Sequence, residues 1–191
     1  MLRSSRFVAS FATALAVGGA AIVPATPALA ADSPIYRTIL QPGEDESQVM
    51  VTWRTKSKAD EVLEVTGPEG TTTFQADERD FGALLYKSQF ATATDLQPDT
   101  EYSYRVGSEE GGWSEPETFN TGSNGDEWSF LTVADPQIGV DLKVDDQAEQ
   151  WRKTIAHAAS HVPNANMIWS LGDQVEGWGA QVPQYDAYFS A

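Results

Sequence analysis

Between residues 35 and 121 the chain consists of short alternating segments separated by turn residues, and this pattern limits the possible folds more than any other feature. Residues 49–55 alternate apolar and polar side chains after an acidic turn. Further runs at residues 62–65, 71–74 and 84–91 follow at the spacing expected of a β-sandwich. No helical period competes with this alternation. The pattern therefore predicts an all-β domain made of two packed sheets.

Residues 96–106 (LQPDTEYSYRV) indicate which kind of sandwich this is. Four apolar side chains occupy alternate positions around a turn and so share one face: Leu96, Tyr102, Tyr104 and Val106. The stretch resembles the corner of fibronectin type III domains, where a Leu-x-Pro-x-Thr-x-Tyr-x-Tyr-x-Val sequence leads into a late strand. Trp53 stands where that family has its buried core tryptophan. We expect these rings in the core; the alternative is an exposed carbohydrate-binding platform made of Trp53, Tyr102 and Tyr104.

The first thirty residues have the composition of a secretory signal peptide. Arg3 and Arg6 give a positive start, and residues 7–23 are small and apolar. The small-x-small sequence at residues 28–30 predicts cleavage after Ala30, and hence a secreted, extracellular or wall-associated protein. An uncleaved membrane anchor is the alternative. No other run approaches the roughly 20 apolar residues that span a bilayer, so no membrane span is expected after cleavage.

The charge balance excludes one class of partner. The 191 residues include 12 basic and 28 acidic side chains, for a formal net charge of −16. Without a basic stripe, a nucleic-acid-binding patch is not expected. The sequence also has no cysteine, so an exported form must be stabilised by packed cores, with or without a bound metal, rather than by disulfides.

A different pattern begins after the turn-rich residues 121–126. Residues 128–134 and 167–171 are apolar runs of strand length, and residues 145–161 have helical spacing. One apolar stripe runs along the expected helix at steps of three and four: Val144, Ala148, Trp151, Ile155, Ala158 and Val162. The succession of strand, helix and strand predicts a β-α-β unit with two parallel strands.

Each of the two expected strands is followed by an acidic residue, Asp135 after the first and Asp173 after the second. The carboxyl ends of neighbouring parallel strands lie at one sheet edge about 4.8 Å apart, so both carboxylates would face one crevice. Close carboxylates repel unless a proton or cation lies between them, and such oxygen-rich sites suit hard or borderline divalent metals. We therefore predict that Asp135 and Asp173 bind metal, with Pro136 and Gly172 shaping the turns. The alternative is that both are solvated turn residues.

Both motifs resemble calcineurin-like metallophosphoesterases of the purple acid phosphatase-like group, which join an N-terminal fibronectin-like domain to a dinuclear-metal domain. The Asp-x-His motif of the family is matched by DPQ at residues 135–137, and its Gly-Asp-x-x motif by GDQV at residues 172–175. The resemblance implies two divalent or trivalent metal ions, of the iron, zinc or manganese class, and phosphate ester substrates. It also implies that Asp135 binds one metal and that Asp173 bridges both.

Two positions depart from the family pattern. Gln137 replaces the usual histidine and either contributes an amide oxygen or makes only a hydrogen bond. Glu176 stands where purple acid phosphatases have the tyrosine that colours their iron; its carboxylate could still bind a hard metal, but a purple centre is not expected. The family's Gly-Asn-His-Asp/Glu and Gly-His-x-His motifs are absent from the 191 residues. We therefore expect an N-terminal fragment that contains no catalytic residue of its own and is itself inactive.

The two histidines of the sequence, His157 and His161, are four residues apart on the expected helix. That spacing can chelate a metal in principle. Both lie off the apolar stripe near the C-terminal end of the helix, where histidine is electrostatically favoured. We therefore expect surface residues rather than replacements for the missing metal ligands.

Taken together, these features predict three segments. They are a signal peptide at residues 1–30, a mostly β fibronectin type III-like sandwich at residues 32–122, and the start (β-α-β) of an α/β metallophosphoesterase domain at residues 126–191. The expected function is that of a secreted metal-dependent phosphoesterase, hydrolysing phosphomonoesters as acid phosphatases do. The alternatives are a secreted cell-surface or wall-binding fibronectin-type module without catalysis, and the product of a truncated gene. The sequence specifies no oligomeric state.

Overall fold

The structure is a computed structural model, and it describes residues 35–79, 86–123, 125, 127–141, 143–177 and 181–190. The expected signal peptide at residues 1–30 lies outside the described residues, as do residues 84 and 85 of the expected run 84–91. Within the described parts, no helix is both long enough and apolar enough to cross a membrane.

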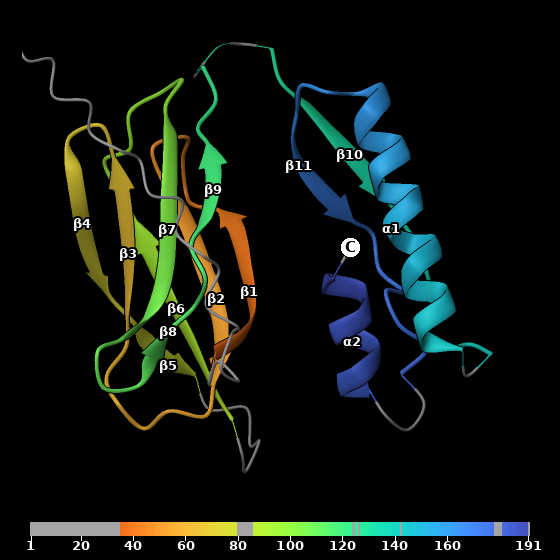
Figure 1. The fold of residues 1–191 in the computed structure, drawn as a ribbon. Helices are drawn as coiled ribbons and strands as arrows, with labels where there is room; N and C mark the ends of the chain where they lie inside the picture. Colours follow the sequence, from red (N-terminus) through yellow and green to blue (C-terminus); the bar gives the residue numbers. More distant parts are fainter. Residues whose placement is uncertain are drawn as a thin grey trace, which may run out of the picture. The chain divides into compact units, whose positions relative to one another are not determined.

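The first part of the chain forms two antiparallel sheets (Figure 1). One sheet has the order β1 (Ile35–Pro42), β2 (Val49–Thr55), β6 (Lys87–Ala93) and β5 (Asp77–Arg79). The other has the order β4 (Gly70–Gln75), β3 (Val62–Gly67), β7 (Glu101–Ser108) and β8 (Gly112–Trp113), with β9 (Glu117–Asn120) also paired to β7. The predicted β-sandwich is therefore confirmed.

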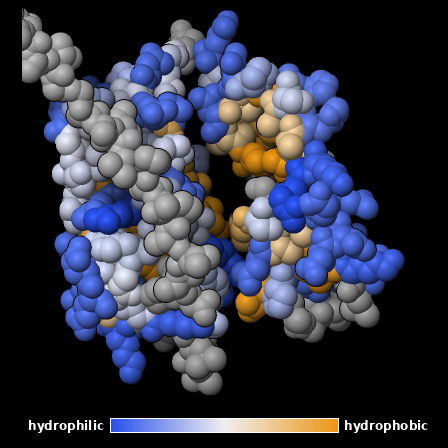
Figure 2. All heavy atoms as spheres, viewed as in Figure 1, coloured by the Kyte–Doolittle hydropathy of each residue, from blue (hydrophilic) through white to orange (hydrophobic). Residues whose placement is uncertain are grey.

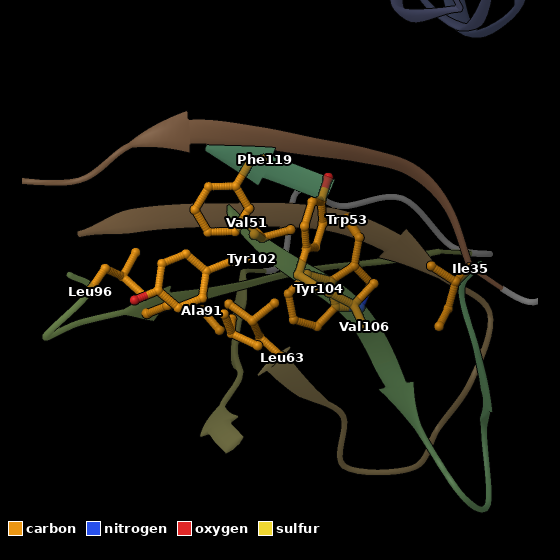
Figure 3. Packing of buried hydrophobic residues seen from close by; sticks show 12 residues of the cluster. Ile35, Val51, Trp53, Leu63, Ala91, Leu96, Tyr102, Tyr104, Val106 and Phe119 are labelled. Atoms are coloured by element: carbon orange, nitrogen blue, oxygen red, sulfur yellow. The ribbon is translucent and has the colours of Figure 1, made fainter. Parts of the chain in front are cut away.

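Side chains from both sheets fill the space between them (Figure 3). Twelve apolar residues are buried there: Ile35, Val51, Trp53, Leu63, Val65, Ala91, Ala93, Leu96, Tyr102, Tyr104, Val106 and Phe119. Trp53 is only 1% exposed, and Tyr102 stacks on Phe119 with ring centres 5.5 Å apart. The core prediction for Trp53, Tyr102 and Tyr104 is thus confirmed. Because these rings are buried, they cannot form an exposed carbohydrate-binding platform.

The corner before β7 is held by the hydroxyl of Tyr102. The backbone N–H of Gln97 donates a hydrogen bond to this hydroxyl at 2.8 Å. A tyrosine that bonds back to the backbone a few residues upstream is the tyrosine corner of Greek-key sandwiches. The hydrogen bond is the physical reason why the fibronectin-like motif combines a turn with this aromatic residue.

Glu61 is a buried acid that the sequence analysis did not anticipate. Its side chain is 2% exposed, and each oxygen accepts a hydrogen bond: Oε2 from Trp53 Nε1 at 2.6 Å and Oε1 from Thr55 Oγ1 at 2.8 Å. Burying a carboxylate is unfavourable unless its oxygens are hydrogen-bonded. Glu61 therefore ties the core tryptophan and the end of β2 to the residue just before β3.

The later part of the chain contains β10 (Ser129–Val133), α1 (Val144–His161), β11 (Ala165–Ser170) and α2 (Gln181–Phe189) (Figure 1). Strands β10 and β11 pair in parallel, with Leu131 opposite Ile168, so the predicted β-α-β unit is confirmed. Trp151 from the apolar stripe of α1 is buried and stacks on Tyr188 of α2, with ring centres 5.4 Å apart. As predicted, His157 and His161 are exposed.

The segment from β10 to α2 also exposes large apolar side chains, and Figure 2 shows apolar surface over it. Seven large hydrophobic residues are at least two-fifths exposed among the described residues: Trp128, Val140, Ile168, Trp169, Leu171, Val182 and Phe189. All seven follow the sandwich in the sequence. Here α1 packs beside a two-stranded sheet, which is less than a complete α/β layer arrangement provides.

Candidate metal centre

The loops that follow β10 and β11 continue the parallel pairing of the two strands. Leu171 N–H donates to Val133 O at 2.8 Å, just beyond the last paired residues. Further along, Asp135 N–H donates to Gly172 O at 3.3 Å, and Gln137 N–H donates to Asp173 O at 2.9 Å. These hydrogen bonds keep the backbone of Asp135 beside that of Asp173 at the carboxyl edge of the sheet.

The same two loops contain an unusual concentration of left-handed backbone. The φ angles are +55° at Asp135, +42° at Gln137 and +50° at Asp173. Residues other than glycine rarely adopt this backbone region, although aspartate does so more readily than most. Each residue held in it costs on the order of 1–3 kcal/mol of conformational free energy, and such residues cluster at functional sites. Gly172 has a φ of +112°, a backbone conformation that glycine adopts far more easily than other residues. Space is not the reason for glycine here, because a Cβ at this position would meet no other atom within 4 Å. The sheet thus holds two acids on rigid, strained turns.

The carboxylates themselves are free to accept a ligand. Asp135 and Asp173 are exposed, and neither carboxylate has a hydrogen bond or ion pair with another described residue. Gln137 and Glu176 lie in the same loops and are partly buried. The Glu176 N–H donates to Ile138 O at 3.1 Å, which ties this position to the first loop as well. The four sequence-predicted positions therefore come from two loops that are joined by backbone hydrogen bonds.

This acid pair is not a complete metal site by itself. Among the described residues, no three histidine, cysteine, aspartate or glutamate side chains are close enough together to hold a metal ion. Structural and catalytic zinc sites, for example, take at least three protein ligands. The donor chemistry of two aspartates fits a hard cation in part, and further ligands would have to complete it.

Two glutamines that the sequence analysis missed hold the loops in place. Gln147 of α1 accepts a hydrogen bond from Gly139 N–H at 2.6 Å, and Gln184 of α2 accepts one from Gly177 N–H at 3.0 Å. The Gln184 side chain is 4% exposed and packs so closely that a Cβ on Gly139 would lie 2.2 Å from its Nε2. The only sequence signal for either residue is a polar side chain on a helix. Their role depends on tertiary packing, which a linear pattern does not contain.

A sandwich with a tyrosine corner, followed by a β-α-β unit with acids at the carboxyl edge of its strands, is the architecture that the sequence motifs predicted. Residues 35–121 match a family model described as the N-terminal domain of purple acid phosphatase. The chain is therefore purple acid phosphatase-like and carries the N-terminal domain of that family, which confirms the resemblance.

One solved structure of a purple acid phosphatase has a similar fold. The chain is similar to the purple acid phosphatase PPD1 from yellow lupin (Lupinus luteus) seeds, with a TM-score of 0.63 and 15% sequence identity. The match covers 83% of this chain and 32% of the lupin chain, so this chain spans about a third of that protein's length. It is also similar to the sensor domain of the anti-sigma factor RsgI4 of Pseudobacteroides cellulosolvens, with 18% sequence identity and a TM-score of 0.35. That match covers 50% of this chain and 97% of the sensor-domain chain. No curated protein matches the chain.

Proposed function

We propose that this chain is part of a secreted, metal-dependent phosphoesterase in which Asp135 and Asp173 supply ligands to a dinuclear metal centre. The observation that supports the proposal is the pairing of the two strand-end loops, which places two carboxylates on adjacent, strained turns, neither with a partner among the described residues. The purple acid phosphatase N-terminal domain that precedes these loops supports the phosphoesterase assignment.

Each residue has a distinct part in the proposed site. Asp135 would hold one metal ion and Asp173 would hold both, while Gln137 and Glu176 would border them and offer an amide and a carboxylate oxygen. When bound, the two ions would offset the charge of a phosphomonoester and activate water for its hydrolysis. Gln147 and Gln184 act as positioning residues, because their amide oxygens hold the two ligand-bearing loops through backbone hydrogen bonds.

Metal binding by the purified chain tests this proposal directly. We expect weak Mn²⁺ binding, measured by equilibrium dialysis, which is lost in Asp173→Asn and reduced in Asp135→Asn. Each substitution removes a negative ligand while nearly preserving volume, and asparagine tolerates left-handed backbone as aspartate does. Gln137→Ala should have a smaller effect because a neutral amide contributes less than a carboxylate.

Asp99 provides a matched control for these variants. It is an exposed aspartate with a φ of +50°, and it lies at the corner of the sandwich, far from the two loops in sequence. Asp99→Asn should leave metal binding unchanged, and far-ultraviolet circular dichroism should show native folding in every variant. Unchanged metal stoichiometry in Asp173→Asn would remove the bridging role. Phosphomonoester hydrolysis is then measured on any longer product of the same gene, with the same variants.

Secretion has its own test. Expression of residues 1–191 in an exporting host should yield protein that begins at Ala31, as measured by mass spectrometry of the intact chain. Recovery of the uncleaved chain in the membrane fraction would instead support the anchor alternative.

A further inference from the structure

The last two turns of α1 place two imidazole rings side by side on the protein surface. The rings of His157 and His161 have centres 4.4 Å apart and are tilted by 56° to one another. Both side chains are exposed. The full sequence has no other histidine and no cysteine, so these two rings are its only imidazole ligands, and imidazole suits copper, nickel and zinc.

A hydrogen bond sets the tautomer of one ring. Nδ1 of His161 lies 2.9 Å from the backbone oxygen of His157, and a carbonyl oxygen can only accept. Nδ1 therefore carries the proton, which leaves the lone pair on Nε2. Histidines that bind metals characteristically donate their other ring N–H to a carbonyl or carboxylate in this way. The hydroxyl of Ser160 donates to the same carbonyl at 2.7 Å and steadies this arrangement.

The separation of the rings indicates which metals fit. With metal–nitrogen bonds of about 2.0–2.1 Å, two imidazoles bound at a right angle hold their ring centres about 4.5 Å apart. A tetrahedral angle would need a separation of roughly 5 Å. The observed 4.4 Å is close to the separation for a right angle, which is compatible with neighbouring positions of a square-planar or octahedral ion. Cu²⁺ and Ni²⁺ favour these geometries.

The electrostatics at this end of the helix favour a cation as well. The rings lie where the helix ends at His161, and the C-terminal end of a helix carries partial negative charge. The net charge of −16 also raises the local concentration of cations around the protein.

We propose that His157 and His161 form a surface site for one Cu²⁺ or Ni²⁺ ion, with water in the remaining coordination positions. This site is separate from the candidate centre at Asp135 and Asp173. The helix starts beside the loop that follows β10 and ends beside the start of β11, so the histidines lie at the opposite edge of the sheet from the acids (Figure 1).

The test is a calorimetric titration of the purified chain with CuCl₂ and with NiCl₂. We expect one high-affinity equivalent, and His157→Ala or His161→Ala should each weaken it on the order of a hundredfold, because the second ligand then no longer adds its chelate effect. Since only two imidazoles exist, both of their proton resonances should broaden together on addition of Cu²⁺. Both side chains are exposed, so neither variant should change the fold.

A double variant separates this site from the carboxylate centre. Asp135→Asn combined with Asp173→Asn should retain Cu²⁺ binding, whereas the histidine variants should retain any Mn²⁺ binding. Equal Cu²⁺ affinity with and without the histidines would overturn the proposal, as would loss of Cu²⁺ binding only in the double aspartate variant. Failure of this site would leave the proposed phosphoesterase centre untouched.

Discussion

The sandwich and the segment from β10 to α2 differ in how far their apolar side chains are buried. The sandwich buries twelve of them in one continuous core, whereas the main cluster of the later segment buries three: Ile138, Trp151 and Tyr188. The seven highly exposed large hydrophobic residues of the described chain all belong to the later segment. Burial of apolar surface is the main favourable term in folding, so the two regions should differ in stability. A sandwich is closed by its own second sheet, while a β-α-β unit needs covering layers from elsewhere.

A pair of tryptophan substitutions provides the sharpest test of this difference. Trp53→Ala should lower the free energy of unfolding by roughly 3–5 kcal/mol, because it leaves a cavity in a closed core and removes the donor to Glu61. Trp128, which is 62% exposed, is the matched control, and Trp128→Ala should change stability by no more than about 0.5 kcal/mol. Urea unfolding followed by circular dichroism measures both. Equal losses would show that the later segment is as well packed as the sandwich.

Amide hydrogen exchange should show a contrast of intermediate size. We expect the amides of β2 and β7 to exchange on the order of a hundredfold more slowly than those of β10 and β11. The reason is that local opening of the sandwich strands would expose buried apolar side chains, whereas many apolar side chains of the later segment are already exposed. Exchange followed by mass spectrometry of peptides resolves the two regions. Uniform protection would mean that the segment from β10 to α2 is stable without further covering layers.

The smallest expected effect is a response of the sandwich to alkali. Burial, together with the hydrogen bond from its hydroxyl to Glu117 at 2.8 Å, raises the pKa of Tyr104. Because the folded state favours the neutral phenol, this contribution to stability is fully present below the ordinary tyrosine pKa of about 10 and declines as the pH rises above it. Tyr104→Phe should cost about 1 kcal/mol at pH 7 and should make the loss of stability above about pH 10 shallower.

Urea midpoints at neutral and alkaline pH measure this effect. Tyr36 serves as a reference, because burial raises the pKa of its hydroxyl too, and some alkaline sensitivity should therefore persist in Tyr104→Phe. A variant that loses stability with pH as steeply as the unmodified chain would show that Tyr104 ionises as easily in the folded state as in the unfolded one.

Local signals explain why the sandwich could be predicted from the sequence. The alternation in residues 49–55 and the turn before Tyr102 are short-range patterns, and the structure places both as expected. The short strands β5, β8 and β9 were not predicted individually, since two to four residues cannot establish a period. Glu61 could not be predicted because its partners, Trp53 and Thr55, belong to β2, which lies in the opposite sheet from β3.

The candidate site likewise has features that local sequence patterns predict and features that depend on tertiary packing. Strand-end positions predicted that the loops of Asp135 and Asp173 would be neighbours, because parallel strands bring their carboxyl ends to one edge. The anchoring by Gln147 and Gln184 depends on helices that return from elsewhere in the chain, and no local pattern marks it. Likewise, the exposure of His157 and His161 followed from the helical period, but the approach of their rings depends on side-chain torsions that the period does not specify.

The left-handed turns at Asp135, Gln137 and Asp173 limit which substitutions can be interpreted. A valine or isoleucine at any of these positions would clash with its own backbone, so loss of function there would report misfolding as readily as lost chemistry. Glycine would relieve the strain and remove the carboxylate together, and a gain in stability would then accompany the loss of a ligand. Asparagine alone keeps both the shape and the backbone preference of aspartate. At these turns, selection for backbone conformation and selection for charge favour the same few residue types. The pattern of substitutions in related sequences would therefore not by itself show whether a residue is kept for its backbone conformation or as a metal ligand.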